Sequence, residues 1–264
     1  MLKLLNIDKT FNIGTINEKH VLKKLNLEID DGDFITVIGG NGAGKSTMLN
    51  IISGVHISDG GRIMLNDKNI TYMTEVQRAK YFGRLFQDPM MGTAPNMSIE
   101  ENLAMAYRRT KRRGFGWGIT NEERKMYKEK ISILGLGLED RMTSKVGLLS
   151  GGQRQAVTLL MATLQKPEVL LLDEHTAALD PKTAANVLKI TKEIVDEDKI
   201  TTLMITHNMH DAITIGNRLI MMDEGHVALD ISGEEKQNLT VETLLSKFEK
   251  ASGNEFTSDK VLLS

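Results

Sequence analysis

The run from Gly39 to Ser46 has the residue types and spacing needed to bind a polyphosphate. It fits the pattern G-x-x-x-x-G-K-[ST], in which glycines let the backbone wrap closely around phosphate with its N–H groups pointing inward. We expect Lys45 to bridge the β- and γ-phosphates of a nucleotide, Ser46 to ligate Mg²⁺ and Thr47 to assist at the phosphates. The predicted nucleotide-binding residues of this run are Gly39, Gly40, Asn41, Gly42, Ala43, Gly44, Lys45, Ser46 and Thr47.

The elements on either side of this run suit the same chemistry. Phe34–Ile38 is apolar and β-branched, which predicts a buried strand, and residues 47–53 predict a helix. The positive N-terminal end of such a helix adds to the attraction for phosphate. The alternative is a glycine-rich turn beside an unrelated lysine, and it does not account for this order of strand, loop and helix.

Two adjacent carboxylates at the end of an apolar strand could handle a metal ion and a water molecule. The strand is Val169–Leu172, and Asp173 and Glu174 follow it directly. Ionised carboxylates in such a place are costly unless they are paired or bound to metal. We expect Asp173 to hold Mg²⁺, directly or through water, and Glu174 to polarise the water that attacks the γ-phosphate. The alternative is a strand that stops at a polar turn, which the phosphate-binding pattern upstream disfavours.

Five further segments make a resemblance to a known family specific. They are Phe11, Phe86-Gln87-Asp88-Pro89, Leu149-Ser150-Gly151-Gly152-Gln153, Ala178-Leu179-Asp180 and Ile205-Thr206-His207. Together with the glycine-rich run and the acidic strand end, they resemble in kind and order the motifs of ATP-binding-cassette (ABC) ATPases. The resemblance covers about residues 1–235, nearly the whole chain.

The resemblance implies a role for each segment. Gln87 would sense Mg²⁺ and the attacking water, His207 would contact the γ-phosphate, and Phe11 would stack on adenine. Asp180 would reach the site of an opposite subunit. The signature would close over ATP held by that second subunit, through Ser150, Gly151, Gly152 and Gln153. The expected catalytic residues are therefore Lys45, Gln87, Glu174 and His207, and the expected metal ligands are Ser46, Gln87 and Asp173.

The residues of the signature also make sense on local physical grounds. Ser150 is a good N-cap for a helix predicted over Gln153–Leu164, because its hydroxyl can accept a hydrogen bond from a first-turn N–H. A second helix N-terminus could then approach a γ-phosphate from the far side. ATP would in this way become part of a dimer interface.

Three features leave alternatives open. Phe11 could be a core residue rather than a platform for adenine. His175 stands where most members of the family have proline; it is either a tolerated loop residue or an imidazole that tunes Glu174 or the segment after it. The basic and aromatic segment 108–118 is either a solvated loop or a docking surface near lipid headgroups or a permease.

Composition limits the remaining possibilities. The 264 residues include no cysteine, which excludes disulfides, thiolate zinc sites and a cysteine nucleophile. The net charge is −2, so we expect no nucleic-acid partner. No apolar run approaches the roughly 20 residues that span a bilayer, so a membrane role must come through a partner.

The order of elements predicts an α/β fold with a mainly parallel core sheet. Strand-like stretches at Leu2–Ile7 and Val21–Ile29 come first, and strands and helices alternate again after residue 165. The resemblance implies a RecA-like P-loop NTPase core with an antiparallel β subdomain and an inserted α-helical subdomain near residues 86–165. We expect an ATPase domain over 1–235 and a partly flexible helical tail over 236–264.

The resemblance implies the ATP-binding and ATP-hydrolysing subunit of a bacterial ABC transporter, with ATP and Mg²⁺ as cofactors. We expect an importer of a small solute such as an amino acid. Its partners would be a second cassette in a homodimer, an integral-membrane permease and a separate solute-binding protein, at the cytoplasmic face of the cell membrane. The alternative is a soluble ABC ATPase acting in Fe–S assembly or on DNA or ribosomes.

Overall fold

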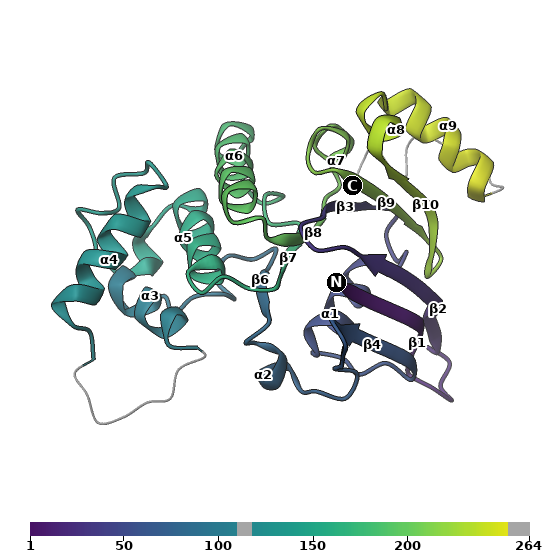
Figure 1. Ribbon diagram of the computed structural model, residues 1–264, viewed down its shortest axis with the longest axis horizontal. Helices are drawn as coiled ribbons and strands as arrows, with labels where there is room; N and C mark the ends of the chain where they lie inside the picture. The colour runs from purple at the N-terminus through teal and green to yellow at the C-terminus, as the bar shows by residue number, and fades with distance from the viewer. Residues whose placement is uncertain (110–117, 253–264) are drawn as a thin grey trace. The chain divides into compact units, whose positions relative to one another are not determined.

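The computed structural model describes residues 1–109 and 118–252 (Figure 1). The chain forms two compact units. The first comprises Met1–Arg78 together with the chain from Ile200 onward, and the second comprises Ala79–Lys199. Most of the basic and aromatic segment, residues 110–117, lies outside the described residues, as does the end of the tail from residue 253.

An antiparallel sheet forms the N-terminal part of the first unit. Its strands are β1 (Leu2–Phe11), β2 (Lys19–Ile29), β4 (Gly60–Leu65) and β5 (Lys68–Asn69), in the order β2-β1-β4-β5. Leu2 pairs with Ile29 and Leu4 with Leu27, and all four side chains are buried. The antiparallel β subdomain expected from the sequence is therefore present.

The first unit also contains a mainly parallel set of strands. They are β3 (Phe34–Ile38), β8 (Thr201–Ile205), β9 (Arg218–Asp223) and β10 (His226–Ser232), in the order β10-β9-β3-β8. β3 runs parallel to both β8 and β9, whereas β10 pairs with β9 as an antiparallel hairpin. Every residue of β3 and β8 is buried, as expected for parallel strands covered on both faces.

Helices cover these strands. The helices of the first unit are α1 (Lys45–Ser53), α2 (Glu75–Arg78), α7 (Met209–Thr214), α8 (Gly233–Gln237) and α9 (Val241–Ser252). α8 and α9 lie beside β10 (Figure 1). Leu244 and Phe248 of α9 are fully buried and join the core that contains Ile38 and Met221. The last described helix is thus packed onto the sheet.

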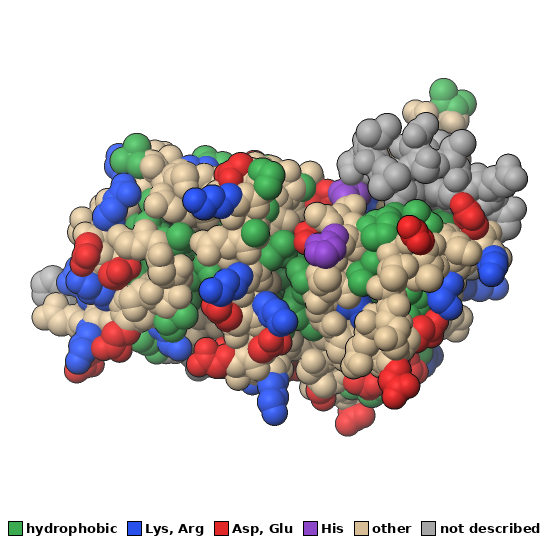
Figure 2. Space-filling model, turned by 90° about the horizontal axis from the view of Figure 1, so that it is seen from above, with side chains coloured by type: hydrophobic (Ala, Val, Ile, Leu, Met, Phe, Trp, Pro, Cys, Tyr) green, Lys and Arg blue, Asp and Glu red, His purple; other side chains and the backbone are tan. Residues whose placement is uncertain are grey.

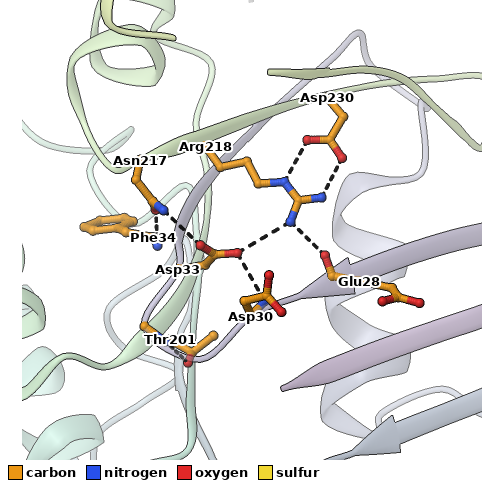
Figure 3. A network of polar contacts seen from close by, with 9 residues as sticks. Glu28, Asp30, Asp33, Phe34, Thr201, Asn217, Arg218 and Asp230 are labelled. Carbon is orange, nitrogen blue, oxygen red and sulfur yellow. Dashed lines mark hydrogen bonds and ion pairs between the residues drawn. The ribbon is translucent and has the colours of Figure 1, made fainter. Parts of the chain in front are cut away.

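A network of charged and polar side chains joins the two sheets of the first unit (Figure 3). The Arg218 guanidinium donates two hydrogen bonds to Asp230, at 2.7 and 2.5 Å, and one to the Glu28 carbonyl at 2.8 Å. Asp33 lies 3.5 Å from the same guanidinium and accepts a hydrogen bond from Asn217. Hydrogen bonding to Asp230 raises the pKa of Arg218, so this side chain stays charged. The network fixes the start of β3, the strand that leads into the glycine-rich run.

The second unit consists of two parallel strands and a group of helices. The strands are β6 (Phe82–Leu85) and β7 (Val169–Asp173). The helical elements are α3 (Ile99–Tyr107), α4 (Asn121–Ser132), a 3-10 turn at Val146–Leu148, α5 (Gly151–Thr163) and α6 (Pro181–Asp198). Capping boxes begin α3, α4 and α5, so these helices start where their sequences supply a serine or threonine three residues before glutamate or glutamine.

The surface has no single-sign field on the face drawn in Figure 2. Lys and Arg side chains are interspersed there with Asp and Glu side chains, in keeping with the net charge of −2. An interspersed surface gives little long-range attraction for a polyanion.

Candidate nucleotide-binding and hydrolysis site

The glycine-rich run forms a tight loop that only glycine can build at two positions. Gly39 has φ +146°, and a β-carbon built on it would lie 2.2 Å from the Met222 carbonyl oxygen. Gly44 has φ +102°, and its β-carbon would lie 2.7 Å from the Leu22 side chain. Both positions require a backbone without a side chain. The loop is therefore a backbone cradle of the kind that a phosphate group fits.

The helix that follows the loop is open at its N-terminus. α1 begins at Lys45, and its N-cap, Gly44, provides no side-chain hydrogen bond. No acidic residue occupies the first turn. The first N–H groups of a helix need partners, and an anion satisfies them. Ser46 is exposed and Thr47 half-buried at this end of the helix.

Lys45 is held by the loop itself. Its side chain is 6% exposed, and its Nζ donates to the carbonyl oxygens of Gly39 at 2.7 Å and Gly40 at 3.1 Å. Asn41 and Gly42 at the tip of the loop are exposed, whereas Ala43 is buried. The structure thus brings the nine residues predicted from the sequence into one local cradle, with the Lys45 ammonium group inside it.

His207 leaves the same edge of the sheet as the glycine-rich loop. Val37 of β3 pairs with Ile205 of β8, and Thr206 N–H donates to the Val37 carbonyl at 3.2 Å. Since β3 and β8 are parallel, the loop after the one and His207 after the other emerge side by side. His207 is half-buried. The fold thus brings together the glycine-rich loop and His207, which are about 160 residues apart in the sequence.

Phe11 lies at the end of β1 and is half-buried rather than enclosed in the core. Its ring meets the His56 ring edge to face, with centroids 5.2 Å apart, and the Lys9 ammonium lies 5.4 Å from its centroid. Lys9 is fixed in turn by an ion pair of 2.8 Å with Asp59. A ring held in this way and partly open to solvent can offer a face to a planar ligand.

In the second unit, the two carboxylates lie at the end of β7: Asp173 is its last residue, one beyond the predicted end at Leu172, and Glu174 follows it. The Asp173 side chain is 15% exposed, and its Oδ2 lies 3.9 Å from Nη2 of Arg84 on the neighbouring strand β6. Glu174 is half-buried and has φ +48°, a left-handed conformation that is uncommon for a residue with a side chain. Such backbone strain is concentrated at functional sites.

Gln87 is placed next to these carboxylates by strand pairing. Leu85, the last residue of β6, pairs in parallel with Leu172 of β7, so the segments that follow leave the same edge. Gln87 is exposed two residues beyond β6. Phe86 lies between Leu85 and Gln87 in the sequence. The Arg84 guanidinium lies over its ring, with the guanidinium carbon 4.5 Å from the ring centroid.

The signature begins a helix as predicted. Ser150 is the N-cap of α5, and Ser150 and Gln153 form a reciprocal capping box. The helix itself starts at Gly151, two residues earlier than the predicted start at Gln153. The difference arises because glycines are poor helix formers in isolation, whereas the capping box draws both into the first turn.

The signature touches the segment around Asp180 within the second unit. A β-carbon on Gly152 would lie 2.0 Å from the Thr183 methyl group, and one on Gly151 would lie 3.3 Å from the Leu179 side chain. Asp180 is the N-cap of α6 and accepts a hydrogen bond from Thr183 N–H at 3.1 Å. This hydrogen bonding lowers the pKa of Asp180, so its carboxylate is ionised at neutral pH.

His175 is not a surface loop residue. It is 2% exposed, and its Nε2 lies 3.3 Å from the Thr191 hydroxyl on α6. Burial lowers the pKa of His175 to about 4, so the imidazole is neutral at pH 7. It therefore ties the segment that follows Glu174 to α6 without carrying charge.

Sequence reasoning missed two arginines that the structure places at functional elements. Arg84 stands beside Asp173, and Arg78 is fully buried against the C-terminal end of α1. Neither belongs to a recognisable pattern. The only signal for Arg84 is its position one residue before the end of the short strand Phe82–Leu85.

The residues expected at the site thus fall into two sets. The first unit holds Phe11, the glycine-rich loop with Lys45, and His207. The second unit holds Gln87, the signature, the two carboxylates and Asp180. Among the residues 1–109 and 118–252, no group of three or more His, Asp or Glu side chains forms a cluster that could hold a metal ion alone.

Comparison with known proteins identifies the family. The family described as ABC transporter matches residues 22–177. A tyrosine transport ATP-binding protein from Clostridioides difficile is 44% identical over 251 residues, which is 95% of this chain and 100% of that protein. A spermidine/putrescine import ATP-binding protein from Fusobacterium nucleatum is 34% identical and matches 98% of this chain, which spans 64% of that longer relative.

Solved structures agree with the sequence relatives. A dimeric ATP-binding cassette in a post-hydrolysis state with ADP and Pi has a TM-score of 0.75 and 31% identity, covering 88% of this chain and 98% of that one. A nucleotide-free cassette from an ABC transporter has a TM-score of 0.76 and 26% identity, covering 97% and 99%. None of the described helices is long and apolar enough to cross a membrane. The chain therefore belongs to the ABC transporter family, as an ATP-binding and ATP-hydrolysing cassette of its transporters.

Proposed function

We propose that this cassette powers the import of an amino acid of the size and kind of tyrosine. The observation that carries the proposal is the match to a tyrosine transport ATP-binding protein over that protein's whole length. Other relatives act in the import of spermidine and putrescine or of aliphatic sulfonates, at 34% and 32% identity. These relatives are all transport subunits, which favours a transporter over a soluble ATPase of Fe–S assembly, DNA or ribosomes.

Within the first unit, the loop and α1 would bind the polyphosphate of ATP. Lys45 would turn from the loop carbonyls to the β- and γ-phosphates, and His207 would contact the γ-phosphate from the neighbouring strand end. Phe11 would stack on adenine, because its ring is fixed by His56 and Lys9 and remains partly open.

Within the second unit, Glu174 would orient and polarise the attacking water, with Gln87 beside it. Gln87 and Asp173 of this unit, and Ser46 of the first unit, are the proposed Mg²⁺ ligands, and their donor set fits because hydroxyl, amide and carboxylate oxygens suit this hard cation. Bound Mg²⁺ would neutralise charge that develops on the β- and γ-phosphate oxygens.

The signature would act on a second copy of the chain. The α5 N-terminus, with Ser150 through Gln153, would meet ATP held by the loop of the partner, and Asp180 would reach the same site. Two copies would enclose two ATP molecules as a homodimer. Closing and opening of the dimer would drive a separate permease at the cytoplasmic face of the cell membrane, with a separate solute-binding protein delivering the amino acid.

Transport by the reconstituted complex tests the proposal. The chain is reconstituted with the membrane permease that copurifies with it, and uptake of labelled tyrosine into vesicles is measured with and without ATP. We expect ATP-dependent uptake that Glu174→Gln abolishes although this variant still binds ATP. Copurification with a soluble scaffold or with ribosomes instead of a polytopic membrane protein would contradict the transporter assignment, and uptake of another solute alone would contradict the tyrosine assignment.

A further inference from the structure

Lys19 stands beside the phosphate-binding loop of its own unit, although it belongs to none of the motifs. It is the first residue of β2, and its Cα pairs across the ladder with that of Phe11. A β-carbon built on Gly42, at the tip of the loop, would lie 3.1 Å from the Lys19 Nζ. Lys19 thus lies opposite Phe11, the residue expected to hold adenine, and its ammonium group lies beside the loop expected to hold phosphate.

The charge of Lys19 is not neutralised by the part of the chain that the structure describes. Three other lysines on β1 and β2 form ion pairs: Lys3 with Glu28 at 3.1 Å, Lys9 with Asp59 at 2.8 Å and Lys23 with Glu224 at 3.7 Å. The side chain of Lys19 makes no hydrogen bond or ion pair with any residue within 1–109 or 118–252. An exposed ammonium group held next to an uncapped helix N-terminus raises the positive potential of the loop.

We propose that Lys19 is a further nucleotide-binding residue, whose ammonium group contacts the polyphosphate chain of bound ATP. The inference rests on the proposed phosphate-binding role of Gly39–Ser46. Lys45 binds the phosphates from within the loop, and Lys19 binds them from β2, past Gly42. A hydrogen bond between an ammonium and a phosphate oxygen is charge-assisted and strong, so this contact adds affinity for ATP and ADP alike.

The test compares Lys19→Gln with Lys24→Gln, which removes the same charge from an exposed position of the same strand. Binding of ATP, ADP and adenosine to the full chain is measured by calorimetry at several salt concentrations. We expect Lys19→Gln to weaken ATP and ADP binding about tenfold and to reduce the salt dependence of both, and we expect Lys19→Arg to restore them. Lys24→Gln and all adenosine affinities should stay within about twofold of wild type.

Three outcomes would overturn the proposal. Equal ATP affinities of Lys19→Gln and Lys24→Gln would show that the ammonium does not reach the phosphates. An equal loss for ATP and adenosine would assign Lys19 to the support of the Phe11 ring. A lowered melting temperature with unchanged affinity would assign it to stability alone. Lys45→Ala is the separate control, because its binding ATP like wild type would contradict the phosphate-binding role of the loop itself.

Discussion

Replacing Arg78 with methionine should destabilise the first unit strongly, because this arginine caps α1 from within the core. The side chain is fully buried. Its guanidinium donates to Ile51 and Ile52 at the end of α1, at 2.6 and 2.8 Å, and to Thr71 and Met73 at 2.7 and 3.0 Å. Burial lowers the pKa of Arg78 to about 10, so the group remains charged at pH 7. All four acceptors are backbone carbonyls, which lose the guanidinium as a donor in the variant.

The magnitude follows from two opposing effects. Hydrogen bonds from a charged donor contribute about 1.5–3 kcal/mol each, so four of them amount to about 6–12 kcal/mol. Burial of the guanidinium offsets this by several kcal/mol, and methionine avoids that cost while filling much of the same space. We therefore expect Arg78→Met to lower the free energy of unfolding by about 3–5 kcal/mol.

Thermal and urea unfolding followed by circular dichroism measure the effect. For a chain of this size, the expected loss corresponds to a melting temperature lower by about 6–20 °C. Arg62→Met is the matched control, since Arg62 is exposed on β4, and it should change stability by less than about 0.5 kcal/mol. If the free energy of unfolding of Arg78→Met is within about 1 kcal/mol of the wild-type value, the capping argument is refuted.

Three further predictions concern the site. Gly39→Ala should abolish ATP binding in calorimetry, because its β-carbon would clash with the Met222 carbonyl, whereas Gly40→Ala has open space and should keep the melting temperature of wild type. Glu174→Gln should bind ATP with wild-type affinity yet lose about 10²-fold or more in phosphate release, and near-normal turnover would remove Glu174 from its role. The pKa of His175 in the folded protein is lowered to about 4. The wild type should therefore have its full stability above pH 6.5 and lose stability as the pH falls from 6.5 to 4. In urea titrations His175→Leu should lack about 3 kcal/mol of this acid sensitivity, and identical pH profiles would contradict a buried neutral imidazole.

Local patterns made much of the fold and of the candidate site predictable. The glycine-rich run, the apolar strand before Asp173 and the cap at Ser150 each depend on neighbours within a few residues. β1 is different, because it continues four residues past the predicted end at Ile7, through irregular pairing that brings Phe11 opposite Lys19. Pairing with β2 and β4 extends it, and no local propensity reveals that.

Interactions between distant segments could not be predicted. Arg218 joins residues about 190 positions away, and Arg78 binds backbone carbonyls, which every residue type offers. Neither produces a sequence pattern. The burial of His175 could not be predicted for a related reason, because His175 contacts Thr191 on the following helix, 16 residues away.

The contact between the signature and α6 limits how many separate motions this cassette has. Gly152 lies so close to Thr183 that the start of α5 cannot shift along α6 without displacing a side chain. The signature and Asp180 are therefore expected to move together. In the proposed dimer, the signature and Asp180 would contact the ATP site of the partner together. A state in which only one of them contacts that site would be absent, so each ATP site would close in a single step.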